Sequence, residues 1–180
     1  MLPACLIARH WWQFFKDRFD IDNMDIDFSK RSKEAILHAR NEAIRFKSLD
    51  IAPEHLFLGI IKTDDQTRNL LLDLGVNVNE IISIISTNFL GQQNNKRDKD
   101  IALSKSADKI MKLVSLEAQL LKQNLIEPYH LLLSILREPY NLIHQEFERL
   151  GLVDGIRKEI GLRVDSGLLK SKKGFLSKWF

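Results

Sequence analysis

Histidine and cysteine, the residue types that most often bind metals or act as nucleophiles, are few in this chain and poorly spaced for either task. None of the histidines stands four residues from another, so the H-x-x-x-H and H-E-x-x-H spacings that place two zinc ligands on one helix face are missing. Cys5 has only His10 near it in sequence, and this pair is the one candidate for a thiol nucleophile. We therefore predict no catalytic site, no metal site and no cofactor. The five histidines are His10, His38, His55, His130 and His144.

Nucleotide hydrolysis by a phosphate-binding loop is excluded as well. Such a loop has the pattern G-x-x-x-x-G-K-[ST], and this sequence contains no Gly-Lys pair. The net charge of +3 is too small to require a nucleic-acid partner. A hydrophobic fraction of 44% is typical of a soluble globular protein, and a single cysteine fits a reducing compartment. We expect a cytoplasmic protein that is not an enzyme.

Two of the histidines belong to a segment that occurs twice. Residues 51–61, IAPEHLFLGII, recur as residues 126–136, IEPYHLLLSIL, so His130 follows His55 by 75 positions. A fixed period indicates a duplicated supersecondary unit. Two copies are too few for an open solenoid, so we expect them to pack against each other in one closed domain. In that setting His55 and His130 are interpreted as structural residues that hydrogen-bond between helices in the two halves.

Each copy is predicted to contain four helices. Ser29 can cap the first, and Pro53 suits the first turn of the second because its missing N–H would be unpaired there anyway. The third helix stops at Gly75, which can take a left-handed C-terminal conformation, and the fourth ends before Gly91.

The second copy follows the same order, with helices that start at Ser104 and Pro128, a third that ends at Gly151 and a last one over about residues 154–164. No segment alternates apolar and polar residues well enough to predict a strand. The expected fold is all-α, with two pseudo-symmetric four-helix repeats packed as one domain. We divide the chain into an N-terminal extension (1–23), a double repeat (24–164, with repeat one 28–90, linker 91–102 and repeat two 103–164) and a C-terminal tail (165–180).

Both ends of the chain carry aromatic residues outside the repeats. The N-terminal extension is interpreted as a docking helix for a partner or membrane, as a segment packed on its own domain, or as sequence upstream of a true start at Met24. The tail is basic, so it could lie on an anionic surface, dock in a groove or remain a soluble tail. The residues concerned are Trp11, Trp12, Phe14, Phe15 and Phe19 in the extension, and Lys170, Lys172, Lys173, Phe175, Lys178, Trp179 and Phe180 in the tail.

The repeated unit resembles the N-terminal domain of the Clp family of AAA+ protein-remodelling ATPases over about residues 24–164. Family members continue into nucleotide-binding modules, whereas this chain ends at Phe180, so the resemblance implies a free-standing recognition module. The residues that carry it are Phe28-Ser29-x-Arg31, Glu42-Ala43, Pro53-Glu54-His55-Leu56, Leu58-Gly59-Ile60 and Leu74-Gly75 in repeat one, and Ile126-Glu127-Pro128-Tyr129-His130-Leu131 and Leu150-Gly151 in repeat two.

The resemblance also implies a ligand site. In some family members the acid before this histidine, together with a Thr or Ser at the start of the first helix, forms a pocket for phosphorylated arginine. Glu54 and Ser29 match in repeat one, with Arg31 beside them, whereas Tyr129 replaces the acid in repeat two. A carboxylate can pair with the guanidinium while helix N-terminal amides hold the phosphate. The alternative is that Glu54 is a first-turn acid that complements the helix dipole.

Two functions from different classes follow. The leading one is a non-catalytic interaction module that binds a Clp-family ATPase, its adaptor or its substrate polypeptides, without nucleic acid. The alternative is a peripheral membrane-associated or surface-associated helical protein that uses its aromatic and basic ends, with weak membrane association through residues 166–180. An enzyme would need chemistry that no motif in the sequence indicates.

Overall fold

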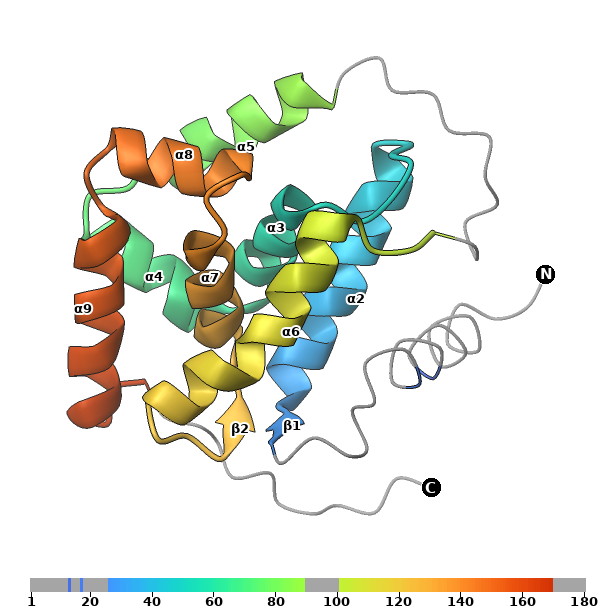
Figure 1. Ribbon diagram of the computed structural model, residues 1–180. Helices are drawn as coiled ribbons and strands as arrows, with labels where there is room; N and C mark the ends of the chain where they lie inside the picture. Colours follow the sequence, from blue (N-terminus) through green and yellow to red (C-terminus); the bar gives the residue numbers. More distant parts are fainter. Residues whose placement is uncertain (1–12, 14–16, 18–25, 90–100, 170–180) are drawn as a thin grey trace.

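The computed structural model describes residues 13, 17, 26–89 and 101–169, and eight helices and two short strands lie within these ranges (Figure 1). The all-α expectation of two four-helix repeats is confirmed. Most of the N-terminal extension, the inter-repeat linker and the basic tail lies outside the described residues. Repeat one contains β1 (Asp27–Phe28), α2 (Lys30–Arg45), α3 (Pro53–Thr63), α4 (Asp65–Asp73) and α5 (Val78–Asn88), and repeat two contains α6 (Lys105–Leu120), β2 (Leu125–Ile126), α7 (Pro128–Arg137), α8 (Leu142–Arg149) and α9 (Val153–Asp165).

The helix ends follow the local chemistry of the sequence. The side chain of Ser29 accepts a hydrogen bond from the N–H of Ser32 at the start of α2, and Ser104 does the same for Ala107 at the start of α6. Pro53 and Pro128 occupy the first turns of α3 and α7, as predicted.

The Leu-Gly pairs end the third helix of each repeat as expected. Gly75 has a φ of 78° and Gly151 a φ of 68°, values in the left-handed region that favours glycine. Gly59 serves a different purpose, because a Cβ at this position would lie 2.1 Å from the carbonyl oxygen of Ala35. Glycine therefore lets α3 approach α2 closely.

The sequence pattern failed to predict the backbone bridges that join the repeats. Strand β1 pairs in parallel with β2, with Phe28 opposite Ile126, and an isolated bridge pairs Ile51 with Leu103. Shifting Phe28 and Ile51 by 75 positions gives Leu103 and Ile126, so the two bridges are related by the internal pseudo-symmetry. Each repeat therefore bonds the start of its first helix to the start of the other repeat's second helix. Such short pairs escape a search for alternating strands.

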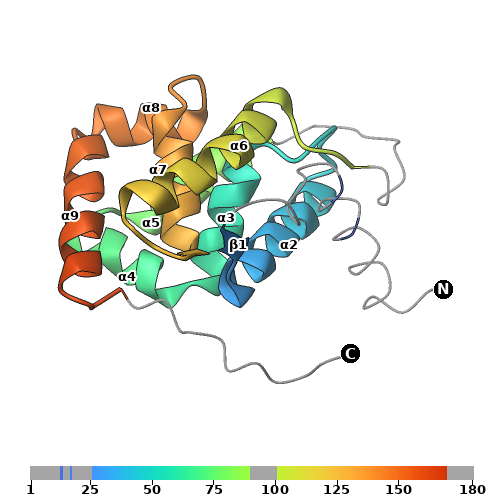
Figure 2. The same ribbon diagram turned by 60° about the horizontal axis from the view of Figure 1, so that its bottom comes forward.

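Helices α3 and α7 form the centre of the molecule. They contact each other, while α2 packs along α3 and α6 packs along α7 (Figures 1 and 2). Helices α4, α5, α8 and α9 lie on the other side of this central pair. The apolar residues of both repeats form one continuous buried cluster, in which Phe57 of α3 contacts Phe147 of α8 with ring centroids 6.0 Å apart. The repeats thus share one core.

Among the described residues, no single helix is long and apolar enough to cross a membrane. Helices α4 and α5 pass that test as a pair, but they are bent by 110° at the break between them. Both helices place apolar residues in the core, including Leu70, Leu71 and Ile85, which are fully buried. A core role accounts for their composition.

Candidate functional site

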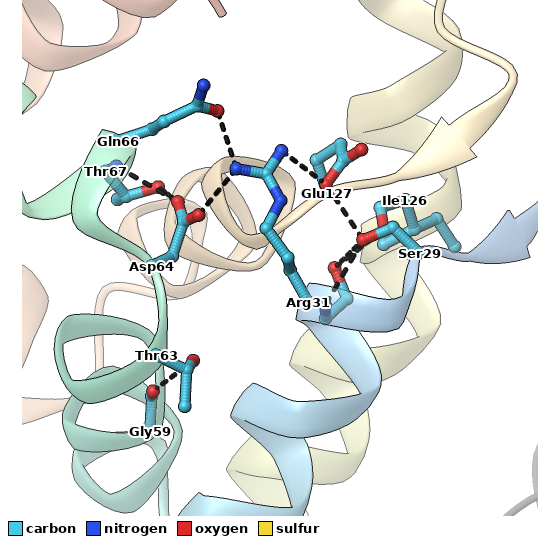
Figure 3. Close-up of polar contacts among 10 residues, drawn as sticks. Ser29, Arg31, Gly59, Thr63, Asp64, Gln66, Thr67, Ile126 and Glu127 are labelled. Carbon is cyan, nitrogen blue, oxygen red and sulfur yellow. Dashed lines mark hydrogen bonds and ion pairs between the residues drawn. The ribbon is translucent and has the colours of Figure 1, made fainter. Parts of the chain in front are cut away.

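Arg31 lies at a junction of three helix ends in which the two repeats meet. Its guanidinium donates to Asp64 Oδ1 at 2.8 Å and to Gln66 Oε1 at 2.6 Å, both at the start of α4, and to Glu127 Oε2 at 3.0 Å, just before α7 (Figure 3). The Arg31 side chain is 24% exposed, whereas each carboxylate is only 1% exposed. We call the set of Ser29, Arg31, Asp64, Gln66 and Glu127 the charged junction.

Ser29 connects this junction to the backbone bridge between β1 and β2. Its hydroxyl donates to Glu127 Oε2 at 2.8 Å, and its N–H donates to the carbonyl of Ile126 at 2.9 Å. The same carbonyl accepts from the Ser32 hydroxyl at 2.6 Å. Ser29 and Ser32 are both buried, so these bonds hold the start of α2 against the start of α7.

Asp64 has two tasks at once. Its Oδ2 accepts hydrogen bonds from the N–H of Thr67 at 3.0 Å and from the Thr67 hydroxyl, so Asp64 caps the start of α4. Its Oδ1 binds Arg31. Two buried carboxylates, those of Asp64 and Glu127, therefore flank one guanidinium. Such a group is stable only while all its members are present, because an unpaired buried charge is costly.

Tyr129 lies beside the charged junction and is fully buried. Burial raises the pKa of its phenol, and the nearby carboxylate of Glu127 raises that pKa further. Its hydroxyl has no hydrogen-bond partner among the described residues. This position in repeat two corresponds to Glu54 in repeat one, so the two repeats bury different polar groups at the same place.

Glu54 occupies the pseudo-symmetric counterpart of this location. Its Oε1 accepts a hydrogen bond from the N–H of Leu142 at 3.0 Å, at the start of α8. The residue is buried, and burial raises the pKa of its carboxyl group. Ser104, before α6, lies on the same side because its N–H donates to the carbonyl of Ile51 at 3.0 Å. We call Glu54, Ser104, Ser106, Asn141 and Leu142 the Glu54 junction.

The structure does not bring Ser29 and Glu54 together, contrary to the expectation of one pocket within repeat one. Glu54 is in the first turn of α3, whereas Arg31 binds Asp64 at the other end of that helix. Ten residues of α-helix span about 15 Å. The serine near Glu54 is therefore Ser104 of the other repeat, since the backbone bridges exchange helix ends between repeats.

His55 and His130, at equivalent positions of the two repeats, are structural, but their bonds are local. Nδ1 of His55 accepts from the N–H of Ala52 at 2.9 Å, and Nδ1 of His130 accepts from that of Glu127 at 2.9 Å, so each caps the start of its own helix. The predicted bonds between helices of the two halves are thus wrong. Burial lowers the pKa of His55 to about 4 and that of His130 to about 3. Both rings are neutral at pH 7.

A surface pocket of about 300 Å³ opens between α5 and α8. Its apolar lining comes from Ile81 and Ile84 of α5 and from Leu150 and Leu152, which flank the turn at Gly151. Charged groups line it as well, namely Glu80, Glu146 and Arg149. No sequence motif indicated this pocket. Among the described residues, no cluster of three or more His, Cys, Asp or Glu side chains is arranged to hold a metal ion.

Comparison with known proteins identifies relatives of this fold and sequence. A family model described as Clp repeat (R) N-terminal domain matches residues 27–149. The ATP-binding subunit ClpC of the ATP-dependent Clp protease from Staphylococcus epidermidis is 27% identical over 124 residues, which are 69% of this chain and 15% of that protein. ClpC from Staphylococcus aureus gives the same values. The chain therefore spans about 15% of the length of these relatives.

Solved structures show the same fold. The N-terminal domain of Hsp104 from Candida albicans has a TM-score of 0.65 at 21% identity and covers 76% of this chain and 91% of its own. The N-domain of ClpV from Vibrio cholerae has a TM-score of 0.62 at 17% identity, with 82% and 89% covered. At these identities the likeness is one of fold.

Proposed function

Because the chain belongs to the Clp repeat (R) N-terminal domain family, we propose that it acts as a non-catalytic protein-interaction module of a Clp-type ATPase system. In this role it binds a substrate or adaptor polypeptide, or regulates the ATPase itself. The observation that carries the proposal is the match of the double repeat, in order and over 69% of the chain, to the ClpC subunit of a Clp protease.

The arrangement of polar groups supports a binding role. The charged junction and the two buried histidines are engaged in holding helix ends, so their bonds account for the buried polar residues that the sequence singles out. The described surface offers apolar positions to another protein, in the lining of the α5–α8 pocket and at several exposed leucines. A rigid core with such a surface suits docking.

The direct test of this proposal measures a Clp-type ATPase with and without the full chain. An interaction module should bind the ATPase, its adaptor or its substrate, and should change the rate of ATP hydrolysis or of substrate degradation in a saturable way. Affinity capture on the full chain, followed by mass spectrometry, identifies which of the three it binds. ATP hydrolysis by the chain alone, or no effect on any member of such a system, would contradict the proposal.

A phosphorylated arginine is the ligand that we propose for the Glu54 junction. The carboxylate of Glu54 would pair with the guanidinium, and the amides at the start of α6, next to Ser104, would hold the phosphate. Ser29 and Arg31, the other residues predicted for this ligand, belong to the charged junction, so we propose a single site, centred on Glu54. The Glu54 carboxylate must then divide its acceptor capacity between the ligand and the N–H of Leu142.

Isothermal titration calorimetry tests this ligand by comparing the affinity for a phosphoarginine peptide with that for the same peptide without the phosphate. We expect one site, weakened by about 1.5–3 kcal/mol in Glu54→Ala and unaffected by Tyr129→Phe, which keeps the buried ring. Two equal sites, or binding indifferent to Glu54, would rule out this assignment. Failure here would leave the broader interaction role standing, since adaptors and ATPases can dock without a modified arginine.

A further inference from the structure

We propose that the pocket between α5 and α8 is a docking site for the chain's own basic and aromatic tail, residues 170–180. The tail would then compete with any partner polypeptide that uses the pocket. The pocket also supports the proposed function, but that function rests on the family match and on other surface features, so either proposal can fail without the other.

Two pseudo-symmetric seams differ in the ion pair that joins their helices. Across the α4–α9 seam, Arg163 donates to Asp73 Oδ2 at 2.9 Å and to Glu159 Oε1 at 2.7 Å, which closes the contact between the helices. The Leu74-Gly75 and Leu150-Gly151 pairs correspond at an offset of 76, so Arg149 stands in place of Asp73 in the α5–α8 seam. Ile85 of α5 corresponds to Ile160 of α9 at an offset of 75, so Asn88 stands in place of Arg163. Asn88 cannot form an ion pair with Arg149, which instead bonds Glu146 on its own helix.

The chemistry of the pocket matches that of the tail. Apolar side chains form its lining, with Ile81 buried and Leu150 43% exposed, so a large apolar side chain could enter without displacing the core. The lining also holds two carboxylates and one guanidinium, and this net negative charge favours a basic ligand. From Ser166 to Phe180 the tail has no acidic residue, and it contains four lysines as well as apolar and aromatic side chains.

The length of the tail fits the distance to the pocket. Leu169 is 4% exposed, and its N–H bonds to the carbonyl of Arg163, so the tail departs from the C-terminal end of α9. Leu152 lines the pocket at the other end of α9, which is about 18 Å away at 1.5 Å per residue. An extended chain covers about 3.3 Å per residue, which gives about 20 Å from Leu169 to Phe175 and about 33 Å to Trp179. The aromatic part of the tail can therefore return to the pocket.

The first experiment tests competition within the full chain. A fluorescein-labelled peptide of residues 168–180 is added to the wild-type chain and to the full chain carrying Phe175→Ser and Trp179→Ser, and binding is followed by fluorescence anisotropy. The substituted chain should bind the peptide at least tenfold more tightly, about 1.4 kcal/mol, because its own tail no longer occupies the pocket. Equal affinity for the two chains would overturn the proposal.

The second experiment locates the binding site on that substituted chain. Ile84→Lys, which blocks the apolar lining, and Glu80→Lys, which reverses an exposed charge, should each weaken the peptide at least tenfold. The matched controls are Leu120→Lys on α6, an exposed leucine, and Glu34→Lys on α2, and both should leave the affinity unchanged. Glu80 is exposed, so its variant should fold even if Ile84→Lys does not. Binding that ignores both pocket variants, or that falls equally in the controls, would overturn the assignment.

Discussion

The charged junction and the Glu54 junction stand at equivalent places in the two halves of the molecule, yet they are built from different chemistry. At the first, Arg31 bridges two buried carboxylates, and the hydroxyl of the tyrosine beside it has no hydrogen-bond partner within residues 26–89 and 101–169. At the second, Ser106 replaces Arg31, and a single buried carboxylate, that of Glu54, accepts a backbone N–H from α8. The backbone bridges at both places are the same.

This difference shows which interactions a duplicated fold must keep in both copies. The backbone bonds between the repeats satisfy groups that would otherwise be buried and unpaired, so both copies retain them. The side chains around them need only satisfy one another locally. The charged junction could therefore hold an ion-pair network that joins three helices, while the Glu54 junction holds one buried acid whose pKa is raised.

Removal of Arg31 should give the largest effect of any single change at these junctions. Arg31→Ala leaves Asp64 and Glu127 buried without their cation, and we expect a loss of about 3–5 kcal/mol in the free energy of unfolding. Ser106→Ala, at the equivalent position of repeat two, removes a hydroxyl without a described partner and should cost less than about 0.5 kcal/mol. Urea denaturation of both variants measures the two values, and similar losses would show that the junctions are equivalent after all.

Acid should destabilise both halves through the buried histidines. The unfolded chain binds protons on histidine near pH 6.5, whereas folded His55 and His130 do so only near pH 4 and 3, respectively. Stability is therefore full above pH 6.5 and falls as the pH drops toward 4, by about 3 kcal/mol for each histidine. In His55→Gln and His130→Gln the amide can still accept the capping bond, and each should remove about half of this pH dependence. If the free energy of unfolding of the wild type did not change between pH 6.5 and pH 4, this would contradict the neutral, buried state of the histidine rings.

Substitutions at Glu54 and Tyr129 compare the two polar groups directly. Glu54→Ala removes the acceptor for the Leu142 N–H and should cost about 1–3 kcal/mol, whereas Glu54→Gln keeps an acceptor, relieves the buried charge and should stay near the wild type at pH 7. Tyr129→Phe removes a hydroxyl that has no partner in the described part of the chain, and should be neutral or slightly stabilising. Thermal melting distinguishes these outcomes, and a marked loss in Tyr129→Phe would reveal a partner for the hydroxyl.

The smallest effect concerns the second ring nitrogen of the histidines. His55 Nε2 lies 3.1 Å from the Ser48 hydroxyl, whereas His130 Nε2 has no partner among the described residues. Ser48→Ala should cost about 1 kcal/mol, because it leaves the His55 N–H unpaired in the core. Gln123→Ala, the equivalent change in repeat two, should cost less. Chemical denaturation of the two variants at pH 7 checks the difference.

Helices were the part of the fold that the sequence could predict. Ser29, Ser104, Pro53 and Pro128 mark helix starts through bonds within a few residues, and Gly75 and its counterpart mark ends through one backbone angle. These signals are local, so they can be read from the sequence without knowledge of the tertiary arrangement. The period of 75 residues likewise showed that the two halves are equivalent.

Pairing between the halves could not be predicted in the same way. A repeat shows which residues correspond but not which ones touch, and the bridge of Phe28 with Ile126 joins residues 98 positions apart. For that reason Ser29 was expected beside Glu54 of its own repeat instead of beside Glu127. Asp64 belongs to no recognisable motif, and Glu127 is part of the repeated motif but was not predicted to be a site residue. A search for charged residues at helix starts that have no charged counterpart in the other repeat would have identified both residues.

The reciprocal bridges make the contact between the repeats an isologous interface, the kind that joins the subunits of a two-fold homodimer. A lone repeat would present both edges of the contact, one before its first helix and one before its second, so two identical copies could satisfy each other's backbone groups. The two halves of this chain thus correspond to the protomers of a fused dimer. Fusion holds each half at a high effective concentration for the other. Fusion also allows the two halves to differ in sequence, so Arg31 can stand on one side of the axis and Ser106 on the other, which two identical chains could not provide.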